Sequence, residues 1–136
     1  AELDAQRKKL GLLRSYGKLR TLAEQAARLA EQAMTVADAK KTQLRGEVTA
    51  MIAEINTSLA SARNQLARLR RIKGFDAAAA RSSLDAAGKQ LEQARAHLAA
   101  GALDRAMASA AQARDGITKI FKAIEKATGV PASPKR

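Results

Sequence analysis

Apolar residues recur at steps of three and four along most of this chain, and that spacing limits the fold more than any other feature. It is clearest in one central seam: Val48, Ile52, Ile55, Leu59, Ala62, Leu66 and Leu69. Such spacing places the side chains on one face of an α-helix. The chain holds 33 alanines and 15 leucines but three aromatic residues, a composition that favours helices over strands. The sequence therefore predicts an all-α protein.

The pattern divides into four expected helices, at about 3–38, 47–73, 77–100 and 103–128. The first has its own apolar face, made of Leu10, Leu12, Tyr16, Leu19, Leu22, Ala26, Leu29, Ala33 and Val36. Residues 39–46 are polar, and the heptad phase differs on their two sides, which predicts a turn. No proline enforces that turn, and Gly46 costs a continuous helix only about 1 kcal/mol. One long helix over 10–73, packed with a two-helix hairpin, is the alternative.

The chain length of 136 residues is enough for one modest core. Gly74 followed by Asp76 is typical of a helix end and a new N-cap, and Gly101 of a further helix end. Four helices of similar length with short connections favour an antiparallel up-down four-helix bundle over residues 1–129. The basic tail 130–136 contains two prolines, and we expect it to be disordered.

One local stretch resembles a known family. Leu91 to Leu98, followed by Gly101-Ala102-Leu103-Asp104-Arg105-Ala106 with Ala110 and Ala113, is similar to the corner between the two helices of a tetratricopeptide repeat. The resemblance implies a glycine turn with small residues packed beside it. It covers a single hairpin, and no 34-residue repeat recurs, so a tetratricopeptide array is not predicted.

The net charge of +12 favours polyanionic partners. In an up-down bundle, residues 1–20, 63–85 and 117–136 meet at one end, and they carry 17 Lys or Arg against five acidic residues. This basic pole is the predicted binding site, with Arg7, Lys8, Lys9, Arg14, Lys18, Arg63, Arg68, Arg70, Arg71 and Lys73 as its binding residues. Basic residues at helix C-termini also complement the helix dipole, so a solvated pole without a ligand is the alternative. The dipole does not explain the basic residues 7–14, which lie near a helix N-terminus.

Catalytic and metal chemistry find no support in the sequence. Cysteine is absent and His97 is the single histidine, so a typical transition-metal site cannot be completed. The glycines are dispersed and form no phosphate-binding loop. We expect no enzyme activity and no cofactor.

The sequence therefore predicts a non-enzymatic helical binding or assembly module whose basic pole engages an envelope polymer, an anionic lipid surface, nucleic acid or an acidic protein. Few aromatics argue against single-strand recognition, whereas non-specific duplex binding stays open. The alternative is a structural subunit that self-associates, or packs on another helical protein, through alanine-rich faces. We expect no membrane span. A chain beginning at Ala1 suits either an exported, periplasmic protein or a cytoplasmic one.

Overall fold

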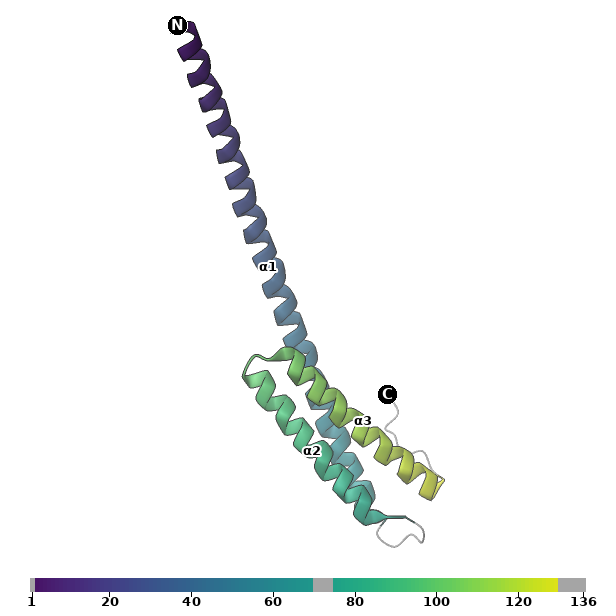
Figure 1. Ribbon diagram of the computed structural model, residues 1–136. Helices are drawn as coiled ribbons and strands as arrows, with labels where there is room; N and C mark the ends of the chain where they lie inside the picture. The colour runs from purple at the N-terminus through teal and green to yellow at the C-terminus, as the bar shows by residue number, and fades with distance from the viewer. Residues whose placement is uncertain (1, 70–74, 130–136) are drawn as a thin grey trace. The chain divides into compact units, whose positions relative to one another are not determined.

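The computed structural model describes residues 2–69 and 75–129, apart from the side chains of 12–14. It contains three helices: α1 (Glu2–Arg68), α2 (Ala77–Ala99) and α3 (Leu103–Thr128) (Figure 1). The chain divides into two compact units, which we call unit 1 (Ala1–Thr42) and unit 2 (Gln43–Arg136). The all-helical prediction is confirmed for the described residues.

The predicted turn at residues 39–46 is wrong, because α1 is helical through all of them. Local side chains support the helix here: the Gln43 amide donates to Glu47 at 2.9 Å, and the Thr49 hydroxyl donates to the Arg45 carbonyl at 2.7 Å. No proline interrupts the backbone hydrogen bonds of the helix here, and the single glycine, Gly46, lowers helix stability only slightly. The described residues therefore form three helices instead of the predicted four. The change of heptad phase marks a change from one packing face to another.

Unit 2 holds the hydrophobic core. The end of α1 (residues 43–68) packs with the α2–α3 hairpin, so three helices enclose the buried side chains (Figure 1). Six of the seven seam residues predicted around residues 48–69 are buried, and Leu69 packs partly buried against them. The core residues are Val48, Ile52, Ile55, Leu59, Ala62 and Leu66 of α1; Ala80, Leu84, Ala87, Leu91 and Ala94 of α2; and Ala106, Ala110, Ala113, Ile117, Ile120, Phe121 and Ile124 of α3.

Local capping fixes the ends of the hairpin helices. The Asp76 carboxylate accepts hydrogen bonds from the amides of Ala78 and Ala79 at 3.1 and 2.9 Å, which confirms the predicted N-cap. Between α2 and α3, Gly101 adopts φ +75°. Its amide donates to the Leu98 carbonyl, and the Ala102 amide donates to that of His97, which together make a Schellman motif.

Small residues let α2 and α3 approach closely beside that turn. Ala94, Ala106, Ala110 and Ala113 have no exposed surface. Farther along the pair, a Cβ built on Gly116 would lie 3.5 Å from the Cβ of Ala87. The glycine turn with packed alanines, which the tetratricopeptide-like stretch implied, is thus present in one hairpin.

Unit 1 is a single stretch of helix. Every residue from 2 to 42 whose side chain is described is exposed. The exposed fraction is between 58% and 76% for its large apolar side chains, namely Leu3, Leu10, Tyr16, Leu19, Leu22, Leu29, Met34 and Val36. The prediction that this apolar face belongs to the core of a four-helix bundle is therefore wrong, because these side chains are exposed and the core contains none of them.

Candidate interaction surface

An exposed apolar seam runs along unit 1. We define the N-terminal seam as Leu19, Leu22, Ala26, Leu29, Ala33 and Val36. Its members are separated by steps of three and four, the a and d spacing of a helix that packs against another helix. The four large side chains are 62%, 61%, 65% and 58% exposed in chain order. A strict seven-residue repeat of this kind favours a left-handed coiled-coil pairing.

The residues beside the N-terminal seam are small and apolar, whereas the opposite face of the helix is charged. Ala23, Ala30 and Ala37 lie next to the seam and widen it into the three-in-seven face of a helix that joins a bundle. Glu24, Glu31 and Asp38 follow at the next position of the heptad, on the side away from the seam. Unit 1 therefore has one apolar face and one charged face.

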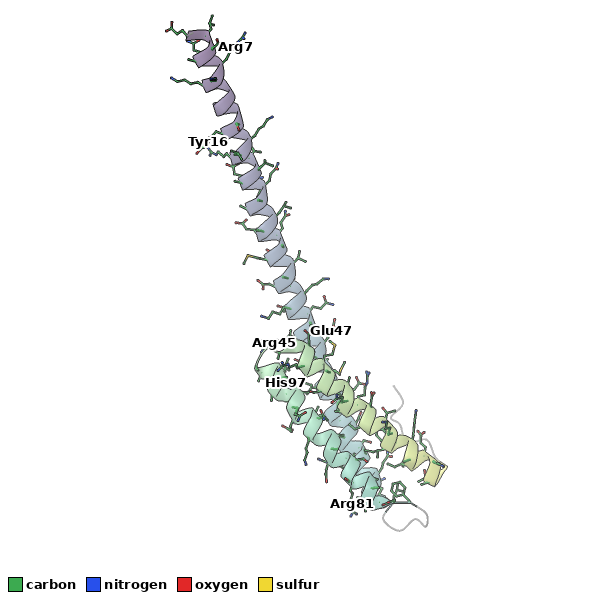
Figure 2. The ribbon with its side chains drawn as sticks, in the orientation of Figure 1. Arg7, Tyr16, Arg45, Glu47, Arg81 and His97 are labelled. Carbon is green, nitrogen blue, oxygen red and sulfur yellow. The ribbon has the colours of Figure 1, made fainter. Side chains whose placement is uncertain are left out.

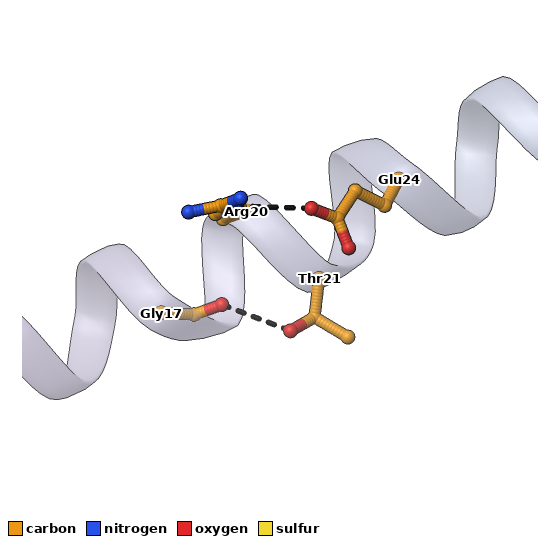
Figure 3. Close-up of polar contacts among 4 residues, drawn as sticks. All are labelled: Gly17, Arg20, Thr21 and Glu24. Atoms are coloured by element: carbon orange, nitrogen blue, oxygen red, sulfur yellow. Dashed lines mark hydrogen bonds and ion pairs between the residues drawn. The ribbon is translucent and has the colours of Figure 1, made fainter.

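The charged face satisfies part of its polarity within the helix, as Figure 3 shows. Arg20 Nε donates to Glu24 Oε1 at 3.0 Å, and the Thr21 hydroxyl donates to the Gly17 carbonyl at 3.0 Å. The Arg20 and Glu24 side chains are 77% and 56% exposed, so water screens the pair and it adds little stability. Both contacts join residues of α1 itself.

The predicted basic residues fall into two groups. Arg7, Lys8, Lys9 and Lys18 are exposed on unit 1, and Figure 2 shows Arg7 extending from α1 near its start. Arg63 and Arg68 are exposed on unit 2. The side chain of Arg14, and Arg70, Arg71 and Lys73 altogether, lie outside what the structure describes.

The structure removes the reason for expecting a single basic pole. Residues 1–20 lie beside 63–85 only if the chain turns at residues 39–46, and α1 continues through this segment. The two basic groups belong to different units. Two ion pairs join described residues, Arg20–Glu24 and Arg95–Glu92, and neither involves a predicted binding residue. Polyanion binding therefore stays a prediction for each of the two basic groups by itself.

Unit 2 offers shallow surface features. A recess of about 200 Å³ is lined by Arg63, Leu66, Ala67, Arg81, Leu84 and Asp85. Arg95 links α2 to α1 through a 3.0 Å bond from Nη2 to Asn56 Oδ1 and also pairs with Glu92. A groove of about 600 Å³ lies between the start of α2 and the end of α3, beside Lys119 and Lys126. The recess and the groove each combine exposed charge with apolar walls.

Metal-binding arrangements are not found in the described part of the chain. No group of three or more His, Cys, Asp or Glu side chains there could hold a metal ion. His97 is half-buried near the end of α2. None of the described helices is both long and apolar enough to cross a membrane.

Comparisons with known proteins add no assignment: no family model, no curated protein and no solved structure matches the chain. The assignment of a site therefore rests on the geometry of the chain itself.

The sequence reveals every residue of the N-terminal seam but not its role. Its spacing and composition resemble those of the buried seam in unit 2, so the sequence alone predicts that both belong to the core. The signal that separates them is the change of phase at residues 39–46, which also predicts a turn. Two out-of-phase seams on one continuous helix present two different apolar faces, of which the structure buries one.

Proposed function

We propose that this protein is a non-enzymatic assembly module that joins helical chains, copies of itself included, through the N-terminal seam of unit 1. The observation that carries the proposal is the exposure of four large apolar seam residues on a helix that the rest of the described chain leaves bare. Unit 2 supplies the folded body, and unit 1 supplies the helix that pairs.

Three physical arguments support this function. An isolated helix is marginally stable in water, since most helix stability in proteins comes from packing an amphipathic face. Burying one Leu or Val side chain contributes about 1.5–3 kcal/mol, so covering the seam is a substantial driving force. Contiguous apolar patches of this kind on a surface typically mark interaction sites.

The test is sedimentation velocity over a wide concentration range. It compares the purified wild-type chain with the double variant Leu22→Glu/Leu29→Glu. We expect the wild type to associate and the variant to dissociate at least about 100-fold more readily, because two carboxylates per chain enter the interface without partners. That factor corresponds to about 2.7 kcal/mol.

The matched control is Thr21→Glu/Thr35→Glu, which adds the same charge to exposed residues outside the N-terminal seam. It should associate like the wild type. A wild type that stays monomeric at every concentration, or a control that dissociates as much as the seam variant, contradicts the proposal.

A second function, binding of a polyanion by the basic residues at the start of α1, is supported by one observation. Arg7, Lys8 and Lys9 are exposed, and within the described residues none of them has a hydrogen-bonding or ion-pairing partner. Electrostatic attraction to phosphates is the chemistry that such residues offer.

The test measures the affinity for duplex DNA at several salt concentrations. It compares the wild type with the triple variant Arg7→Gln/Lys8→Gln/Lys9→Gln. We expect wild-type affinity to fall steeply with salt, and the variant to have a log–log slope shallower by up to about 2.7, or about 0.9 for each phosphate that the variant leaves unneutralised. The matched control removes three exposed lysines of α3, Lys119, Lys122 and Lys126. Wild-type affinity that does not change between low and physiological salt contradicts this function, as does an equal decrease in affinity in the two variants.

A further inference from the structure

We propose that the partner of the N-terminal seam is a second copy of this chain, paired antiparallel in one register: Leu19 against Leu29, Leu22 against Ala26 and Ser15 against Ala33 of the second copy. This inference rests on the proposed function and specifies its partner and orientation. The pairing is two-fold symmetric, with the axis near residue 24, so both copies use the same surface.

Charge selects the antiparallel orientation. Residues 7–20 carry six Lys or Arg and no acidic residue, whereas residues 28–41 carry three Lys or Arg and two acidic residues. Paired helices lie about 8–10 Å apart, within reach of electrostatic interaction at physiological salt. A parallel pair sets the two strongly basic segments side by side. In the antiparallel register each basic segment meets the nearly neutral one.

Side-chain size selects the register. A parallel, in-register pair places Ala26 against Ala26 and Ala33 against Ala33, which leaves space in two layers of the interface. The antiparallel register places Ala26 against Leu22 of the second copy in the two central layers, and it confines the small pairs, Ser15 with Ala33, to the two ends. Facing layers of this kind interdigitate and leave fewer voids.

The flanking positions fit the same register. Ala23 lies beside Ala23 of the second copy, which allows a close approach, and Lys18 lies beside Gln32, a neutral partner able to accept a hydrogen bond. The acidic residues Glu24, Glu31 and Asp38 stay on the outer face, in water. No charged side chain has to be buried in the interface.

The buried area fits a dissociable dimer. Residues 11–37, a segment symmetric about residue 24, span roughly 39 Å of helix. Four large seam side chains per copy, each covering roughly 60–120 Å², and the alanines between them bury on the order of 1,000 Å² in total. That area is at the low end for specific complexes. A reversible dimer, not a permanent one, is expected.

The test uses single cysteines, because the chain has none of its own. Ser15→Cys and Ala33→Cys are small replacements at exposed positions and leave every large seam side chain in place. The two variants are mixed, oxidised mildly, and their products measured by intact mass. We expect the mixed disulfide to exceed either self-linked product by at least about 10-fold.

The geometry makes this result specific. In the proposed register the two Ser15 positions are 18 residues apart along the pair, about 27 Å, whereas a disulfide needs Cα atoms about 4.4–6.8 Å apart. A parallel pair gives the reverse, with each variant linking to itself. The Leu22→Glu/Leu29→Glu background serves as the control, and the excess of mixed disulfide should disappear in it.

The outcomes separate the two proposals. Self-linked products in excess overturn the antiparallel pairing while leaving the assembly function intact. A dimer in sedimentation that gives no disulfide in the mixture overturns the register. A wild type that sediments as a monomer overturns the assembly function, and this inference with it.

Discussion

Replacing Leu91 by alanine should lower the free energy of unfolding of unit 2 by about 2–5 kcal/mol. Leu91 is 1% exposed and lies in the middle of α2, within the core shared with α1 and α3. Its truncation removes buried apolar surface and leaves a cavity that a closely packed three-helix unit fills only in part. The decrease is large against the 5–15 kcal/mol typical of whole domains.

Native-state hydrogen exchange of the α2 and α3 amides measures this decrease for unit 2 alone. The matched control is Leu29→Ala, the same substitution at a residue that is 65% exposed in the N-terminal seam. In dilute protein it should change exchange in unit 2 by less than about 0.5 kcal/mol. If Leu91→Ala abolishes folding, Leu91→Val should give a smaller, measurable decrease. Equal effects of the two alanine substitutions contradict the assignment of core and surface.

We expect Gly101→Ala to destabilise the α2–α3 hairpin by about 1–2 kcal/mol, because alanine is strained in the left-handed region that φ +75° requires. Nothing lies within 4 Å of a Cβ built on Gly101, so the cost arises from the backbone alone. Gly101→Asn should recover part of the stability, since asparagine tolerates this conformation better than other side chains.

Gly46→Ala should change the stability in the opposite direction to Gly101→Ala. Gly46 is inside α1, has no positive φ and has open space around its Cβ, so alanine should stabilise by about 0.5–1 kcal/mol. Thermal unfolding of the three variants beside the wild type measures all these effects. A decrease in the stability of Gly46→Ala contradicts the continuous helix at residues 39–46.

Local signals in the sequence predicted the hairpin well. The Asp76 N-cap and the glycine end at Gly101 depend on hydrogen bonds between residues a few positions apart, which a local pattern contains. Heptad spacing likewise identified the buried face over residues 48–66. The continuity at residues 39–46 was missed because polar composition and a phase change accompany either a turn or an exposed helix.

The predicted polyanion-binding site depended on the tertiary structure more than the hairpin did. Its ten basic residues were grouped by an assumed topology, and the continuous α1 removes the reason for placing Arg7 near Arg63. Charge counts along a chain are reliable, but which charges lie together depends on how the helices connect. The charge pattern of residues 7–41 kept its value because it lies within a single helix.

By itself, the sequence determined that this protein is helical, where α2 and α3 begin and end, and which face of each helix is apolar. Those properties depend on helical periodicity and capping, which act within about four residues. Only the tertiary structure decided which apolar face is buried. Leu22 and Leu59 have the same side chain and the same heptad spacing, but Leu59 is buried in the core with the α2–α3 hairpin, whereas Leu22 is 61% exposed. A buried face needs a partner helix, and the α2–α3 hairpin is that partner for residues 48–66 of α1.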